Sequence, residues 1–401
     1  MGISLYGAWI TIVSLTSMLV WADLGLGSGL LTRLSRHLAR QDELNARRDI
    51  FATYTIVASV GTAVAAAGLV TPTLLSWSRV LGTEAQLEPL TAQIAVSCIV
   101  IFAFNMPLSL IQRVQYAAGE VSLSNIFTAA GPIISLVLTF AAVHFDSSPV
   151  TTVLAASVGP LIGNMTATVW FFSRHRTLIP SWTDRAGSNA LQLLSLGGLF
   201  VLISTFSAVA NNSDNLIIAQ VLDADAVASY GVPARLMAAM GLLINLVNLP
   251  LWPANANAMA KGDYFWVRRT TVRMTLLSAG FVSVVTCVLI VFGERVSSVL
   301  SRGQVSADPE LLVALGVWWT VVAATSPAIM VQNAAGVLWP QLLGWAAFLV
   351  TTVPLKIGVA EEFGINAIPL AGVICYVVTV VPACYFGYRR ALRGPTNVGP
   401  T

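Results

Sequence analysis

The sequence contains little charge. Only 10% of its 401 residues are Asp, Glu, Lys or Arg, whereas soluble globular domains carry roughly 25%. In contrast, 56% of the residues are hydrophobic and the mean hydropathy is +0.78. Long apolar runs take the place of the mixed polar and apolar pattern of a soluble core. The composition therefore predicts a protein that crosses a lipid bilayer several times.

The sequence also lacks the groups that most enzymes and metal proteins need. The four cysteines lie in apolar stretches without C-x-x-C spacing, and the three histidines form no ligand cluster. There is no phosphate-binding G-x-x-x-x-G-K-[ST] loop and no G-x-S-x-G or H-E-x-x-H motif. The net charge of +3 is too small to indicate a nucleic-acid surface. We therefore expect no cofactor, no metal, no nucleic-acid partner and no enzymatic activity.

Long apolar segments are the dominant feature of the chain. Each is long enough to cross a hydrocarbon core of about 30 Å as a helix. They predict an all-α polytopic membrane protein of about eleven transmembrane helices. The segments are 5–29, 50–75, 91–112, 123–143, 150–172, 193–221, 227–252, 273–293, 311–334, 338–358 and 366–388.

Basic residues concentrate in every second connection between these segments. The connections on the other side contain only Arg79, Arg295, Arg302 and Lys356. Because cytoplasmic loops carry an excess of Lys and Arg, the basic side and the C-terminus are predicted to be cytoplasmic in a bacterial inner membrane. The basic residues of that side are Arg33, Arg36, Arg40, Arg47, Arg48, Arg113, Arg174, Arg176, Arg185, Lys261, Arg268, Arg269, Arg273, Arg389, Arg390 and Arg393.

The two halves of the chain share a short sequence pattern. A Tyr-Gly pair opens both the first and the seventh segment, and Asp42 and Arg47 match Asp263 and Arg268 at one common offset. Corresponding helices would run in the same direction, which predicts parallel repeats. We expect a five-helix N-terminal bundle at 1–190 and a six-helix C-terminal bundle at 191–401. The partner of the sixth segment would lie upstream of Met1, so the first helix of the repeat is expected to be missing.

Several motifs resemble the polysaccharide flippases of the Wzx type, which belong to the multidrug/oligosaccharidyl-lipid/polysaccharide (MOP) superfamily. These motifs are YGAW at Tyr6–Trp9, DLGLG at Asp23–Gly27, DNLIIA at Asp214–Ala219, PARL at Pro233–Leu236 and LWPA at Leu251–Ala254. The resemblance implies two pseudo-symmetric helical bundles as in MATE transporters. It also implies transport of a polyprenyl-diphosphate-linked oligosaccharide by alternating access, with H+ or Na+ coupling in several relatives. Lipid-linked glycan, membrane lipids and polysaccharide-assembly proteins would be the partners.

Two other functions stay open at this point. A cation-coupled multidrug antiporter of the same superfamily would have the same number and pattern of segments. A membrane-embedded glycan polymerase is the third alternative, although such enzymes usually need a long outer loop that carries catalytic residues. The predicted outer loop at 294–310 is short.

Arg235 is the leading candidate for substrate binding. It lies about ten residues into its segment, or roughly 15 Å from the predicted outer end at 1.5 Å per residue. Asp214 is expected at a similar depth on the preceding helix, so the two could form an ion pair. Alternatively, Arg235 could bind a diphosphate, because a guanidinium offers two parallel donors and stays charged. Asp214 could also couple protons or sodium to transport.

Asparagines flank Asp214 and recur along the seventh segment, and four of them are candidates, namely Asn211, Asn212, Asn245 and Asn248. Amides in membrane helices usually make interhelical hydrogen bonds. Recognition of sugar hydroxyls is the functional alternative, and we include all four among the candidate substrate-binding residues.

A second group of residues could act in gating. Asp23 is followed closely by Gly25 and Gly27 near the predicted cytoplasmic end of the first segment. It could pair with a loop arginine, or mark a gate that moves at the glycines. Pro250 and Pro253 are expected to kink the seventh segment and to serve as a hinge.

Overall fold

The computed structural model describes Trp9, Ile12 and residues 25–81, 84–187, 190–222, 224–300 and 308–393. Within these ranges the regular elements are helices and no β-strand is present. Ten of the described helical segments are long and apolar enough to span a membrane. The predicted all-α, multi-pass architecture is therefore confirmed. Each of the ten corresponds to one predicted segment, and the remaining segment, 5–29, lies mostly outside the described residues.

The chain divides into two compact units, residues 1–198 and 199–401. The division falls within helix α8 (Ala190–Val221), so the first turns of α8 pack in the N-terminal unit and the rest belongs to the C-terminal unit. Each unit has its own buried apolar residues.

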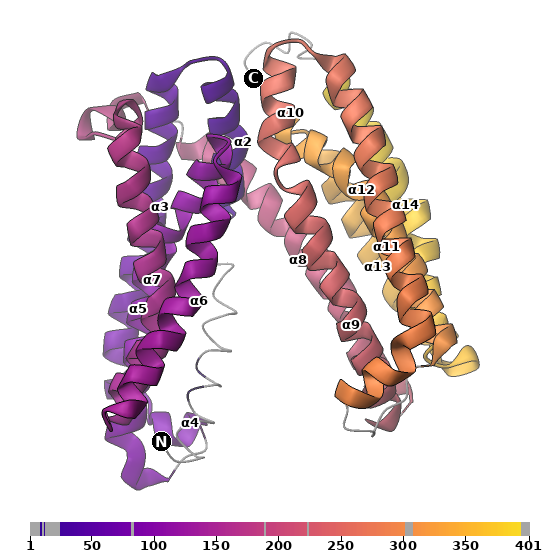
Figure 1. Cartoon of the computed structure of the whole chain (residues 1–401), viewed down its shortest axis with the longest axis horizontal. Helices are drawn as coiled ribbons and strands as arrows, with labels where there is room; N and C mark the ends of the chain where they lie inside the picture. The colour runs from indigo at the N-terminus through magenta and orange to yellow at the C-terminus, as the bar shows by residue number, and fades with distance from the viewer. Residues whose placement is uncertain are drawn as a thin grey trace. The chain divides into compact units, whose positions relative to one another are not determined.

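In the N-terminal unit the long helices run alongside one another (Figure 1). Helix α5 packs against both α3 and α7, and α6 packs against α7. The long helices of this unit are α2 (Leu26–Ala39), α3 (Glu43–Leu74), α5 (Glu88–Ala117), α6 (Val121–His144) and α7 (Pro149–Arg174). Short elements connect them: α4 (Trp77–Leu81), η2 (Ala85–Leu87), η3 (Arg176–Leu178) and η4 (Trp182–Gly187).

Glycines let α6 and α7 approach each other closely. A Cβ atom added to Gly159 would collide with the Gly131 carbonyl oxygen and with Ser135. Small residues at a helix crossing allow backbone-to-backbone packing, which is a main source of helix association in lipid. The α6–α7 pair is therefore fixed by its glycines.

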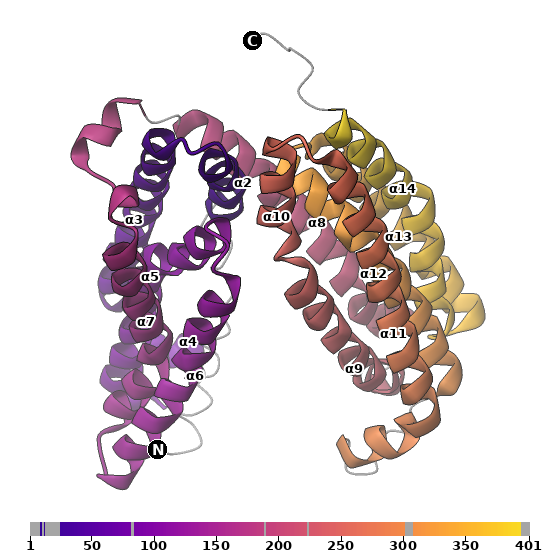
Figure 2. The same ribbon diagram turned by 45° about the horizontal axis from the view of Figure 1, so that its top comes forward.

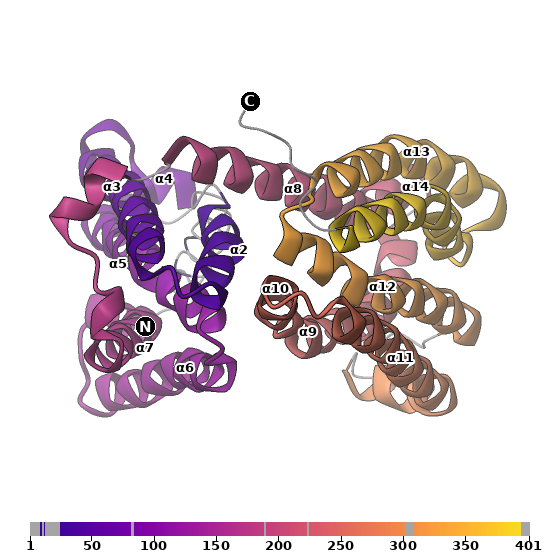
Figure 3. The same ribbon diagram turned by 90° about the horizontal axis from the view of Figure 1, so that it is seen from above.

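In the C-terminal unit α11 packs along α12 (Figure 2), and α13 lies beside α14 (Figure 3). Helix α9 ends at Asn248 and α10 begins at Leu251, so the helical structure is interrupted at Leu249 and Pro250. Pro253 is buried in the first turn of α10. The helices of this unit after α8 are α9 (Ala224–Asn248), α10 (Leu251–Ala260), α11 (Tyr264–Leu300), α12 (Pro309–Ala335), α13 (Trp339–Phe363) and α14 (Ala367–Leu392).

Two of the predicted loops are largely helical, which corrects the sequence-based boundaries. In the predicted 30–49 loop, α2 continues to Ala39 and α3 begins at Glu43. In the predicted 253–272 connection, α11 begins at Tyr264, so Arg268 and Arg269 lie on a helix. Hydropathy marks only the part of a helix that contacts lipid, whereas the backbone hydrogen bonds of the helix continue until a capping residue ends them.

The two turns that precede α3 and α11 have the same local structure. Gln41 and Gly262 have positive φ angles of 57° and 76°. The following residues, Asp42 and Asp263, each accept a hydrogen bond from the backbone N–H three residues later, at 3.2 Å and 2.9 Å. An Asp at this position satisfies a free N–H group of the first helical turn. The shared geometry supports the equivalence of these positions in the two halves.

Candidate functional site

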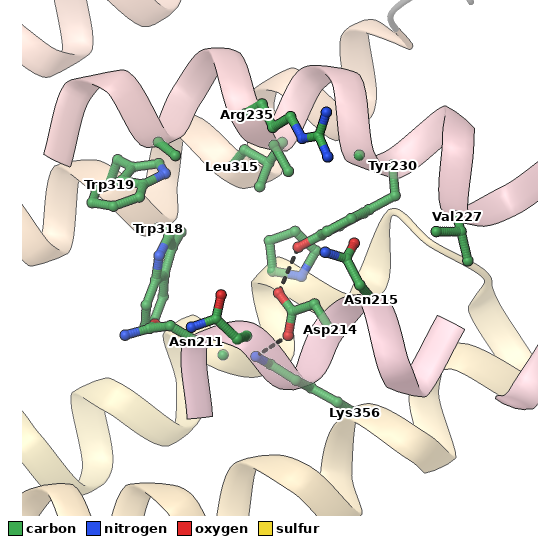
Figure 4. A pocket seen from close by; sticks show the side chains of 16 residues that line it. Asn211, Asp214, Asn215, Val227, Tyr230, Arg235, Leu315, Trp318, Trp319 and Lys356 are labelled. Carbon is green, nitrogen blue, oxygen red and sulfur yellow. Dashed lines mark hydrogen bonds and ion pairs between the residues drawn. The ribbon is translucent and has the colours of Figure 1, made fainter. Parts of the chain in front are cut away.

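A cavity of about 930 Å³ lies within the C-terminal unit. Its walls come from α8, α9, α12, α13 and α14 (Figure 4). The lining combines amides and charged groups with two tryptophans. The lining residues are Asn211, Asn212, Asp214, Asn215, Val227, Tyr230, Gly231, Ala234, Arg235, Ala238, Leu315, Trp318, Trp319, Lys356, Pro369 and Gly372.

Asp214 lies between a cation and a phenol. Lys356 Nζ donates to Asp214 Oδ1 at 2.5 Å, and Tyr230 Oη donates to Asp214 Oδ2 at 2.6 Å (Figure 4). The Lys356 side chain is 4% exposed and that of Asp214 is 15% exposed. Both carboxylate oxygens are therefore engaged, and a nearly buried lysine is neutralised by a carboxylate that reaches the cavity.

Helix register brings these three residues together. Asp214 lies seven residues before the end of α8, and Lys356 lies seven residues before the end of α13. Tyr230 lies six residues after the start of α9. At 1.5 Å per residue, each is about 10 Å from the corresponding helix end. Because these ends lie on the same side of the unit, the three side chains meet at one depth.

The predicted ion pair between Asp214 and Arg235 is wrong. Among the described residues, the Arg235 side chain takes part in no ion pair or hydrogen bond, and it is exposed at the cavity wall. Helix α8 ends at Val221 and α9 begins at Ala224, so Tyr230 lies opposite Asp214 and Arg235 is more than one helical turn deeper. In Figure 4 the guanidinium extends along α9 toward Tyr230.

Lys356 and Tyr230 are site residues that the sequence analysis missed. The predicted segment ended at 358, which placed Lys356 at an outer loop end. Helix α13 continues to Phe363, and Lys356 is 3% exposed within it. The apolar residues on both sides of Lys356 were the available signal for a buried position.

Three of the four predicted asparagines line a cavity, and the fourth is buried between helices. Asn211 and Asn212 line the cavity, and each amide donates to the preceding turn of α8, to Ser207 Oγ at 3.2 Å and to the Ala208 carbonyl at 2.7 Å. Asn245 lines a second cavity of about 390 Å³. Asn248 is fully buried and donates to Ser278 Oγ on α11 at 3.2 Å, so it serves as an interhelical hydrogen bond.

None of the predicted gating residues that the structure describes is among the residues that line the cavity. Gly25 has a φ of 65° and directly precedes α2, where Gly27 is buried. Pro250 and Pro253 lie at the break between α9 and α10. Asp23 lies outside the described residues. A hinge or gating role for these positions stays a prediction.

The cavity carries more positive than negative charge. Among the lining residues that the structure describes, Arg235 and Lys356 supply two cations and Asp214 is the one carboxylate. Among the residues that the structure describes, no group of three or more His, Cys, Asp or Glu side chains could hold a metal ion. The arrangement can therefore accept an anionic ligand through hydrogen bonds and Coulomb attraction.

Comparisons with known proteins give consistent results, although no known family profile matches the sequence. A putative O-antigen transporter of Salmonella typhi is 23% identical over 387 residues, which covers 91% of this chain and 84% of that protein. The crystal structure of the Vibrio cholerae MATE transporter VcmN in the bent form has a TM-score of 0.78 at 16% identity, covering 98% of this chain and 90% of that chain.

Another similar structure is a MOP superfamily transporter from Pyrococcus furiosus, described as having a binding pocket of reverse polarity that suggests a different function. Its TM-score is 0.78 at 14% identity, and the match covers 98% of this chain and 90% of that chain. The protein therefore has the fold of the MATE transporters, and its predicted resemblance to the MOP superfamily is confirmed.

Proposed function

We propose that this protein is a MOP-superfamily transporter that moves a polyprenyl-diphosphate-linked oligosaccharide, a polysaccharide precursor, across the bacterial cytoplasmic membrane by alternating access. The observation that carries the proposal is the positively charged cavity of the C-terminal unit, with Arg235 unpaired among the described residues. A cation is costly inside a membrane protein, so its presence in a cavity indicates a binding role. The similarity to the Salmonella typhi putative O-antigen transporter supports this substrate class.

Arg235 and Lys356 would divide the binding of the diphosphate. The guanidinium of Arg235 can donate two parallel hydrogen bonds to phosphate oxygens, and it stays charged at any physiological pH. Lys356 acts as a compact point charge at the shallower end of the cavity. The ligand would approach Arg235 first, because this side chain is exposed whereas Lys356 is covered by Asp214.

Asp214 would hold Lys356 in the empty transporter. A lysine that is 4% exposed needs a partner, because an uncompensated buried charge costs several kcal/mol. Phosphate oxygens that enter the cavity can share or replace this partner. Tyr230 keeps a hydrogen bond to Asp214 Oδ2, so the carboxylate would remain solvated after Lys356 turns to the ligand.

The basic helix ends support the proposed orientation. Lys261 lies between α10 and α11, and Arg389 and Arg390 lie in the last turn of α14. We place these ends and the C-terminus in the cytoplasm, because positive charge is retained on that side. The charged cavity would then lie nearer the outer leaflet. Coupling to H+ or Na+ and contacts with polysaccharide-assembly proteins stay predictions.

The cation-coupled multidrug antiporter is the second candidate, and the MATE fold favours it as a class. An exporter of cationic drugs is expected to present free carboxylates to its cavity. Here the carboxylate of the lining is already paired with Lys356 and Tyr230. The charge of the cavity therefore favours an anionic substrate.

The test is a translocation assay with the purified full chain in lipid vesicles. A fluorescent polyprenyl-diphosphate oligosaccharide is added, and its transfer between leaflets is followed with an impermeant quencher. We expect Arg235→Ala to slow transfer about tenfold or more, since hydrogen bonds to charged groups are worth about 1.5–3 kcal/mol. Arg269→Ala, an exposed arginine on α11, is the matched control and should leave transfer unchanged. Full activity of Arg235→Ala would refute the diphosphate role.

A further inference from the structure

The second cavity of the C-terminal unit adjoins the charged one. The two share Asn211, Ala238, Trp318 and Trp319. On α9 the lining passes from Arg235 through Ala238, Gly241 and Asn245 at helical spacing, so the second cavity lies deeper along the same face. A single extended ligand could therefore occupy both cavities, with its charged part held at the shallower one.

The lining of the second cavity differs in chemistry from that of the first. Among its described lining residues there is no charged side chain. The lining has three tryptophans (Trp318, Trp319 and Trp345) and amides and hydroxyls that include Asn245, Ser207 and Ser326. Its volume of about 390 Å³ lies within the range of ligand pockets, roughly 300–1,000 Å³. Flat aromatic faces beside polar groups can hold a molecule with one apolar face and hydroxyls around its edge. A pyranose ring has this form.

We infer that the second cavity is a glycan subsite, which binds the sugar residues next to the diphosphate of the transported lipid. The inference rests on the proposed function, because the diphosphate at Arg235 and Lys356 sets the position of the first sugar. The exposed amide of Asn245 would hydrogen-bond the sugar hydroxyls, and Trp319 would stack against the ring. The subsite would make transport depend on the glycan as well as on the lipid phosphate.

The aromatic wall is fixed in place before any ligand binds. Trp318 is stacked on Phe348 with ring centroids 5.8 Å apart and an interplanar angle of 17°. It also meets Tyr376 edge to face at 5.4 Å. Side chains that are held by their neighbours lose little freedom on binding, which favours affinity. Trp318 therefore supports the wall, while the half-buried Trp319 offers the more accessible ring.

Gly241 sets the position of Trp319. A Cβ atom at Gly241 would lie 2.5 Å from both Cη2 and Cζ3 of the Trp319 indole. The indole thus lies directly on the α9 backbone, and a methyl group at Gly241 must displace it. This contact provides a way to move the ring without removing it.

The isoprenoid chain of the lipid is the other apolar group that the second cavity could accept. An isoprenoid makes no hydrogen bonds, so the polar side chains of the lining would have no partner on it. The bilayer also solvates an isoprenoid as well as an apolar pocket does. The mixed lining therefore favours the sugar.

The test measures binding of two probes to the purified full chain in nanodiscs. One probe is polyprenyl diphosphate, and the other is the same lipid carrying a single N-acetylhexosamine. We expect the wild type to bind the glycosylated lipid about tenfold more tightly, a difference in the range of aromatic stacking. Trp319→Leu and Gly241→Ala should reduce this preference to less than about twofold, whereas Trp319→Phe should keep most of it.

Each outcome decides between the alternatives. Arg235→Ala should weaken the binding of both probes equally, which would confirm the anion site separately from the glycan subsite. Equal weakening of both probes by Trp319→Leu would assign the cavity to the isoprenoid and overturn the inference. A Trp319→Leu variant that keeps the wild-type preference for the glycosylated lipid would also overturn the inference. If the wild type binds neither probe, the proposed function fails and the glycan subsite fails with it.

Discussion

The buried pair of Lys356 and Asp214 makes a quantitative prediction about the stability of the C-terminal unit. Asp214→Asn leaves Lys356, 4% exposed, without a counter-charge. Removal of one partner of a buried pair typically costs about 3–5 kcal/mol. Lys356→Met leaves Asp214, which is 15% exposed, reaches the cavity and keeps its hydrogen bond from Tyr230. We therefore expect about 3 kcal/mol or more for Asp214→Asn and a smaller loss for Lys356→Met.

The double variant Asp214→Asn/Lys356→Met should be more stable than Asp214→Asn alone. It contains no buried charge at this position, and an apolar chain of similar length replaces the lysine stem. The free-energy changes of the two single substitutions should therefore be non-additive by about 2 kcal/mol. Strict additivity would show that the two side chains do not stabilise each other and would refute the reasoning.

Native cysteines provide the assay. Cys375 and Cys384 are buried on α14, which packs beside α13, so their alkylation reports opening of this part of the C-terminal unit. A loss of 3 kcal/mol should speed their labelling roughly 100-fold, because each 1.4 kcal/mol is tenfold. Cys98, buried in the N-terminal unit, is the matched control and should label at the wild-type rate.

Three further predictions concern other contacts. Gly159→Ala should destabilise the N-terminal unit by about 1–3 kcal/mol because its methyl group would collide with the α6 backbone, whereas Gly280→Ala has open space and should be neutral in thermal unfolding. Asp49→Asn removes the negative charge and one of the two acceptor oxygens that join α3 to Arg33 of α2 at 2.7 Å and 3.1 Å, so it should cost about 3 kcal/mol in the same assay. Tyr230→Phe should cost only about 1 kcal/mol, since Lys356 still pairs with Asp214.

Hydropathy was sufficient to predict the architecture. Ten helices coincide with predicted segments, because a membrane helix needs a continuous apolar run to match the bilayer. The same signal was insufficient for helix ends. Helix α3 begins at Glu43 and α11 at Tyr264, seven and nine residues before the predicted starts. The capping residues Asp42 and Asp263 marked these ends and are better guides than the apolar boundary.

The site was only partly predictable for the same reason. Arg235 and Asp214 were found because a charge within an apolar run is conspicuous, and both line the cavity. Their pairing was mispredicted because it depends on where α8 ends and α9 begins to within a few residues. Lys356 comes from a helix 142 residues away in the sequence, and no local pattern indicates its contact with Asp214.

We propose that the cavity binds an anionic, glycan-bearing lipid and not a cationic drug. Vesicles with the wild-type chain should therefore be tested with both cargoes side by side, a fluorescent polyprenyl-diphosphate oligosaccharide and a fluorescent organic cation such as ethidium. We expect the wild-type chain to move the lipid-linked oligosaccharide between leaflets and to leave the cation outside the vesicles. Uptake or export of the cation without movement of the lipid would contradict the proposal.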